Sequence, residues 1–96
     1  MLVRVIKSQT NVRQEYFLEQ NGLRFDRLSN GRYAVLRKSR SFDGQLIWHP
    51  IGYTFCEGSY HIFVSYKKRS PEHWFFGITR CDAISGFLSA EADDNK

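Results

Sequence analysis

The segment LRFDRLSNGRYAVLR, residues 23–37, contains the strongest local structural signal in the chain. Asn30 and Gly31 tolerate the two positive φ angles that a type I′ turn requires, and β-forming residues flank them on both sides. This pattern predicts a β-hairpin. We therefore expect antiparallel strands to dominate the fold, and we interpret the neighbouring segments outward from this hairpin.

Further strands are predicted after a loop at residues 38–44, over the ranges 45–49, 51–56, 60–66 and 74–78. Pro50 is expected to stop the strand before it or to place that strand at an edge, because proline cannot donate a ladder hydrogen bond. The clearest strand is 60–66. Its alternation predicts one face with Tyr60, Ile62, Val64 and Tyr66, and an opposite face with His61, Phe63 and Ser65.

Two short helices flank these strands. The first is predicted at residues 12–20, with Asn11 as its N-cap and Gly22 as the residue that ends it. The second is predicted at residues 83–89, because Thr79 and Asp82 match the capping-box pattern just before an apolar helical stripe.

The two ends of the chain differ in character. Residues 2–6 form a short β-branched run that suits one more strand. Residues 90–96 are small and acidic, and we expect them to form a disordered tail after a single domain at residues 1–89. The predicted fold is an α+β domain with a twisted antiparallel sheet of about five strands. A chain of 96 residues has room for one hydrophobic core.

The composition indicates the cellular environment that we expect for the chain. The formal net charge is +4, and residues 91–96 contain three acidic residues and one lysine, so the preceding residues are more basic than the whole. No apolar stretch reaches the roughly 18–20 residues of a membrane-spanning helix, and the N-terminus lacks the apolar region of a signal peptide. We therefore expect a cytoplasmic protein that makes no membrane contact, in which Cys56 and Cys81 remain reduced.

Basic residues gather in two segments close to predicted aromatic strands. The basic residues are Arg37, Lys38 and Arg40 in one segment and Lys67, Lys68 and Arg69 in the other, and the nearby aromatic residues are Trp48, Tyr53, Tyr60 and Tyr66. Phosphates need fixed cations and unpaired bases stack on aromatic rings, so this combination suits single-stranded nucleic acid. The alternative is that the cations protect sheet edges while the aromatic rings fill the core.

Enzymatic chemistry has weaker support in the sequence. Cys56 and His61 could meet across a turn as thiol and base, and Asp43 and Glu57 could hold a divalent cation with Lys67 beside it. However, the spacing of the cysteines and histidines does not suit a zinc site, and no dinucleotide, P-loop, zinc-protease or serine-hydrolase motif is present. No metal or cofactor is predicted.

The aromatic content also favours self-association. The expected interface residues are Tyr60, Ile62, Trp74, Phe75 and Phe76, which could bury excess aromatic surface in a homodimer. The sequence thus predicts a non-enzymatic, homodimeric binding module with a basic aromatic surface for an anionic partner, most favourably nucleic acid. A protein-interaction module without nucleic-acid binding and a small enzyme remain the alternatives.

Overall fold

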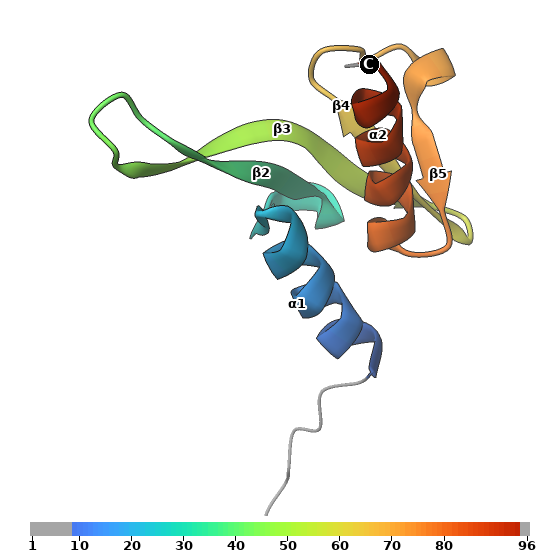
Figure 1. The fold of residues 1–96 in the computed structure, drawn as a ribbon. Coiled ribbons are helices and arrows are strands. Elements are labelled where there is room, and N and C mark those ends of the chain that lie inside the picture. The colour runs from blue at the N-terminus through green and yellow to red at the C-terminus, as the bar shows by residue number, and fades with distance from the viewer. Residues whose placement is uncertain (1–8, 95–96) are drawn as a thin grey trace, which may run out of the picture.

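A computed structural model describes residues 9–94, so the strand predicted at residues 2–6 lies outside the described residues. These residues form a five-stranded antiparallel sheet with two helices (Figure 1). The elements are α1 (Gln9–Asn21), β1 (Leu23–Arg27), β2 (Tyr33–Arg40), β3 (Leu46–Glu57), β4 (Tyr60–Ser65), β5 (Phe75–Gly77) and α2 (Arg80–Asp94). The strand order is β1-β2-β3-β4-β5, which confirms the predicted small α+β domain.

The predicted hairpin is formed by β1 and β2. Asn30 and Gly31 have φ angles of 64° and 71°, and the N–H of Arg32 donates to the carbonyl of Ser29 at 3.4 Å. This is the type I′ geometry that the Asn-Gly pair predicts. The antiparallel register beyond the turn begins with Arg27 opposite Tyr33.

Strand β3 does not stop at Pro50, which corrects one of the two alternatives predicted for that residue. Val35 pairs with Gly52 whereas Leu36 pairs with Pro50, so a β-bulge takes up the extra residue Ile51. Strand β4 ends opposite Gly52, where Ser65 is the partner. Within the described residues, Pro50 therefore pairs with β2 alone and lies at a local edge of the sheet, where proline is tolerated.

The loop predicted at residues 38–44 is shorter than expected. Residues 38–40 belong to β2, and the connection to β3 is a turn in which the N–H of Ser41 donates to the carbonyl of Gln45 at 2.8 Å. Long basic side chains can extend from a strand into solvent. The positive charge of residues 38–40 therefore does not prevent their backbone from pairing with β3.

The helix boundaries are set by local hydrogen bonds. Helix α1 begins at Gln9, so Asn11 lies in its first turn and is not the N-cap, whereas Gly22 has the expected positive φ of 63°. At the start of α2 the capping box is present: the N–H of Thr79 donates to Asp82 Oδ2 at 3.2 Å, and the N–H of Asp82 donates to Thr79 Oγ1 at 3.1 Å.

The acidic tail predicted from residue 90 is wrong for residues 90–94, which continue α2. Arg37 on β2 donates to both carboxylate oxygens of Glu91, with N–O distances of 2.7 and 3.1 Å. This bidentate pair holds the last turns of the helix against the sheet, which local composition could not indicate.

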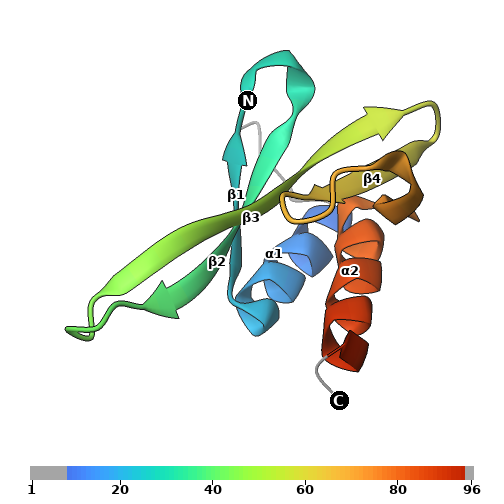
Figure 2. The ribbon, with the colours of Figure 1, turned by 90° about the horizontal axis from the view of Figure 1, so that it is seen from above.

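Both helices lie on the same face of the sheet (Figure 2). Helix α1 contacts β1, and α2 contacts β4 and β5. The core between these layers consists of the buried residues Leu23, Val35, Phe63, Ala83 and Ile84. Over residues 9–94, no helix covers the opposite face of the sheet. In the same residues neither helix has the length and apolar character needed to cross a lipid bilayer.

Candidate functional site

The helix-free face of the sheet carries aromatic side chains in register. Phe63 points into the helix-side core, and its partner Thr54 shares that face. Successive side chains of a strand point to opposite faces, so Tyr53 and Phe55 point away from the helices. Their register partners Val64 and Ile62 point the same way.

The bulge in β3 adds Trp48 to this face. Trp48 and Tyr53 are five residues apart and would point to opposite faces in a regular strand. Their partners on β2, Lys38 and Ala34, are four residues apart and share a face. The extra residue at Ile51 thus restores the alternation, so that both rings lie on the helix-free side.

Four of the rings are in contact with one another. The ring centroids of Tyr66 and Tyr53 are 5.9 Å apart, those of Tyr53 and Phe55 6.1 Å, and those of Phe55 and Trp74 5.5 Å. The indole N–H of Trp74 donates to the carbonyl of Arg69 at 2.9 Å, which holds this ring in place. We call the surface formed by Trp48, Tyr53, Phe55, Tyr66 and Trp74 the aromatic face.

Three arginines lie over the aromatic face. The guanidinium carbon of Arg24 is 5.0 Å from the ring of Trp48, and that of Arg69 is 5.1 Å from the ring of Tyr66. Arg32 lies 5.3 Å from the Tyr53 ring and, by a second contact, 5.4 Å from the Phe55 ring. These are cation–π distances. Arg24 is also paired with Asp26, whereas the ion pairs found among residues 9–94 include neither Arg32 nor Arg69.

Sequence reasoning missed Arg24 and Arg32 as members of this surface. Arg32 directly follows the Asn-Gly turn, and its neighbour Tyr33 pairs with Thr54 on β3. This position could have indicated that Arg32 lies near the aromatic residues of β3. Arg24 could have been found from the alternation of β1, in which Leu23 points into the core and Arg24 points away.

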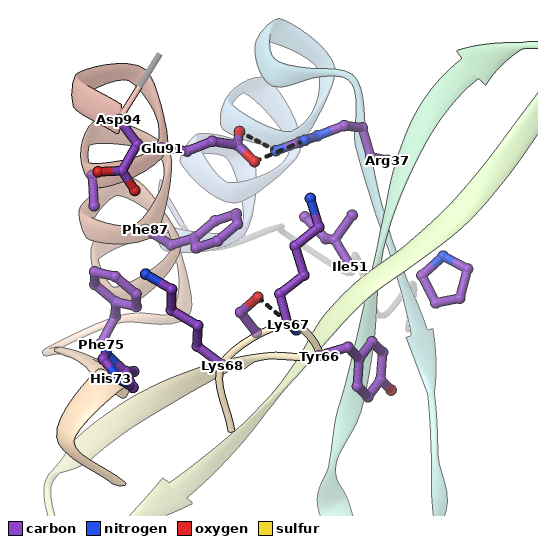
Figure 3. A pocket seen from close by; sticks show the side chains of 13 residues that line it. Arg37, Ile51, Tyr66, Lys67, Lys68, His73, Phe75, Phe87, Glu91 and Asp94 are labelled. Atoms are coloured by element: carbon purple, nitrogen blue, oxygen red, sulfur yellow. Dashed lines mark hydrogen bonds and ion pairs between the residues drawn. The ribbon is translucent and has the colours of Figure 1, made fainter. Parts of the chain in front are cut away.

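The six predicted basic residues are divided between surfaces. Arg37, Lys67 and Lys68 line one cleft between α2 and the sheet (Figure 3). Lys38 and Arg40 alternate onto the helix-free side of β2, where Arg40 donates to the carbonyl of Gly44 at 3.0 Å, and Arg69 lies on the aromatic face. The structure therefore brings Arg37 together with Lys67 and Lys68, and separates them from Lys38 and Arg40.

The predicted interface residues differ in how far they are exposed. Tyr60 is 55% and Phe76 57% exposed, whereas Ile62 is fully buried within the chain. Phe75 is half-buried against α2, with its ring 5.8 Å from that of Phe87, and Trp74 is half-buried on the aromatic face. Of the five residues, Tyr60 and Phe76 therefore present the most surface to a second chain.

Cys56 and His61 meet across the β3–β4 hairpin. They are register partners, and the Sγ atom lies 3.2 Å from His61 Nδ1. Burial, with a smaller effect from the nearby Arg80, lowers the pKa of His61 below its ordinary value. The imidazole is therefore mostly neutral near pH 7, and a neutral imidazole can accept a proton from the thiol.

This geometry predicts that the two cysteines react at different rates. Cys56 is exposed and has a base in contact, whereas burial and then the Asp82 carboxylate raise the pKa of the Cys81 thiol. At pH 7.5 a disulfide reagent should modify Cys56 first, and His61→Gln should slow that phase by about tenfold or more. Cys81 serves as the internal control, because its rate should not change. Equal Cys56 rates with and without His61 would contradict the prediction.

The acidic residues do not form a joint site. Asp43 accepts hydrogen bonds from the Ser41 hydroxyl and the Gln45 N–H in the β2–β3 turn, and the first of these chiefly lowers the pKa of its carboxyl. Glu57 is at the other end of β3, and a strand advances roughly 3.3 Å per residue. Within residues 9–94, no three His, Cys, Asp or Glu residues are grouped in a way that could hold a metal ion.

Comparison of the chain with protein-family models, with curated proteins and with solved structures found no match. Functional inference therefore depends on the chemistry of the surfaces described above. Of these, the aromatic face combines contacting rings with three arginines.

Proposed function

We propose that the chain is a non-enzymatic binding module whose aromatic face binds single-stranded nucleic acid. The observation that carries this proposal is the placement of Arg24, Arg32 and Arg69 over aromatic rings on a sheet face without helices. Planar cations and rings in alternation suit a ligand that alternates phosphates with flat bases.

Binding has a direct physical rationale. Exposed rings such as Tyr66 offer a stacking surface to an unpaired base, and such stacking contributes about 1–3 kcal/mol per base. Arg32 and Arg69 can turn from their rings toward a phosphate without breaking an ion pair. Lys38, which is opposite Trp48 in the register, extends the positive charge along β2.

The test is the affinity for a mixed-sequence single-stranded oligonucleotide as a function of salt. With about three phosphate contacts, affinity should fall about 20-fold between roughly 50 and 200 mM monovalent salt. Fluorescence anisotropy with a labelled oligonucleotide measures this directly. A duplex of the same sequence should bind more weakly, because its bases are not free to stack. No anisotropy change at low salt would overturn the proposed function.

A protein-interaction module is the second candidate, because Tyr60 and Phe76 expose large apolar surface beside β5, an edge strand of the described sheet. If two copies pair here, the mass measured by light scattering should rise toward that of a dimer with concentration. Phe76→Glu should abolish the rise, since a charge cannot be buried unpaired at low cost. Phe42→Glu, at a fully exposed site in the β2–β3 turn, is the matched control. A constant monomer mass at high concentration would remove the homodimer.

A further inference from the structure

A cleft of about 680 Å³ lies between α2 and the neighbouring parts of β3 and β4, on the helix side of the sheet (Figure 3). This volume falls in the range of small-molecule sites, about 300–1,000 Å³. Ile51, Phe75 and Phe87 supply apolar surface, and Tyr66 lies at the edge. The cleft is therefore distinct from the aromatic face but adjoins it at Tyr66, whose ring also contacts Tyr53.

Two lysines extend into the cleft from the turn after β4 (Figure 3). Ser65 fixes this turn: its hydroxyl accepts from the N–H of Lys67 at 3.2 Å, and its carbonyl accepts from the N–H of Lys68 at 3.3 Å. The ion pairs among residues 9–94 include neither lysine. Two ammonium groups at the cleft thus have no ion-pair partner among these residues, and the carboxylates of Glu91 and Asp94 line the same cleft.

The third cation of the cleft, Arg37, already has an ion-pair partner within the chain. Its bidentate pair with Glu91 spans from β2 to α2 across the cleft (Figure 3). A carboxylate that accepts two parallel N–H bonds occupies the same donors that a phosphate would use. Glu91 therefore satisfies Arg37 and adds negative charge near Lys67 and Lys68.

We propose that this cleft binds the terminal phosphate of a nucleic-acid strand, with Lys67 and Lys68 as its ligands; this inference rests on the proposed function of the aromatic face. A terminal phosphomonoester carries about −1.5 to −2 charge at pH 7, more than the single charge of an internal phosphodiester, and so matches two lysines. The shared residue Tyr66 provides the continuity: the last base stacks on the aromatic face while its phosphate enters the cleft.

The experiment compares three oligonucleotides of one sequence, which carry a 5′-phosphate, a 3′-phosphate or hydroxyls at both ends. One phosphorylated form should bind about tenfold more tightly than the hydroxyl form, the ratio expected for one charge-assisted hydrogen bond. Equal affinity for all three would overturn the terminal-phosphate site and leave the proposed function intact. Failure of all three to bind would overturn the proposed function itself.

Variants distinguish binding of the phosphate in the cleft from general attraction by the positive charge of the protein. Lys67→Gln with Lys68→Gln should remove the preference for the phosphorylated end, whereas Lys38→Gln with Arg40→Gln removes the same charge outside the cleft and should weaken all three oligonucleotides equally. Glu91→Gln should increase the preference, because it removes a negative charge and releases Arg37. Retention of the full preference in the Lys67 and Lys68 double variant would overturn the assignment of these ligands.

Discussion

Replacement of Phe63 with alanine is expected to lower the free energy of unfolding by about 3–5 kcal/mol. Phe63 is fully buried at the centre of the core between the sheet and the helices, and its ring centroid is 4.8 Å from that of Phe87 on α2. The variant loses the burial of the ring and leaves a cavity that β4 and α2 cannot close. Domains of this size have a free energy of unfolding of only about 5–15 kcal/mol, so this substitution would remove a large fraction of it.

Denaturant unfolding followed by circular dichroism measures this loss, as a lower midpoint with little change in slope. Phe42→Ala is the matched control, because the Phe42 side chain is 109% exposed in the β2–β3 turn and its removal should change stability by less than about 0.5 kcal/mol. Equal midpoints for the two variants would mean that Phe63 is not at the centre of the core.

Removal of Arg32 and Arg69 together is expected to weaken oligonucleotide binding by about 100-fold, since each contributes a phosphate contact and a planar surface beside a stacked base. Both guanidinium groups lie over rings of the aromatic face. The substitutions Arg32→Gln and Arg69→Gln keep a polar, hydrogen-bonding side chain while removing the charge and the guanidinium plane. Both positions are exposed, so the fold should not change.

Arg13→Gln with Arg27→Gln is the control for charge, because these exposed arginines on α1 and β1 lie away from the aromatic face. The control should lose only about threefold in affinity through the weaker general field. Anisotropy titrations at one salt concentration compare the two pairs. If both pairs lose the same affinity, binding depends on net charge alone and the aromatic face is not the binding surface.

The secondary structure was predictable wherever a few neighbouring residues decide it. The Asn30-Gly31 turn and the Thr79–Asp82 capping box are both present as predicted. Predictions were wrong where a distant partner overrides the local preference: a bulge carries β3 through Pro50, against the alternative that Pro50 stops the strand, and residues 90–94 are helical where Arg37 holds Glu91. Neither partner is visible in the local pattern.

The candidate surfaces were predictable only in their residue types. The abundance of arginine, lysine and aromatic side chains predicted a basic aromatic surface, and Trp48, Tyr53 and Tyr66 do share one face. The sequence could not divide the basic residues between that face and the cleft, because the division depends on which side of each strand faces the helices. It also could not reveal that Arg37 is paired.

The sequence by itself determined the Asn30-Gly31 turn, the Thr79–Asp82 capping box and the alternation of β4, because positive φ angles and side-chain caps involve residues within four positions of one another. The tertiary structure alone decided which side chains meet. The bulge at Ile51 places Trp48 on the same face as Tyr53, and the pair between Arg37 and Glu91 joins residues 54 positions apart. Such contacts form only when sheet and helices pack, since the free energy that holds them comes from the shared core and not from either segment.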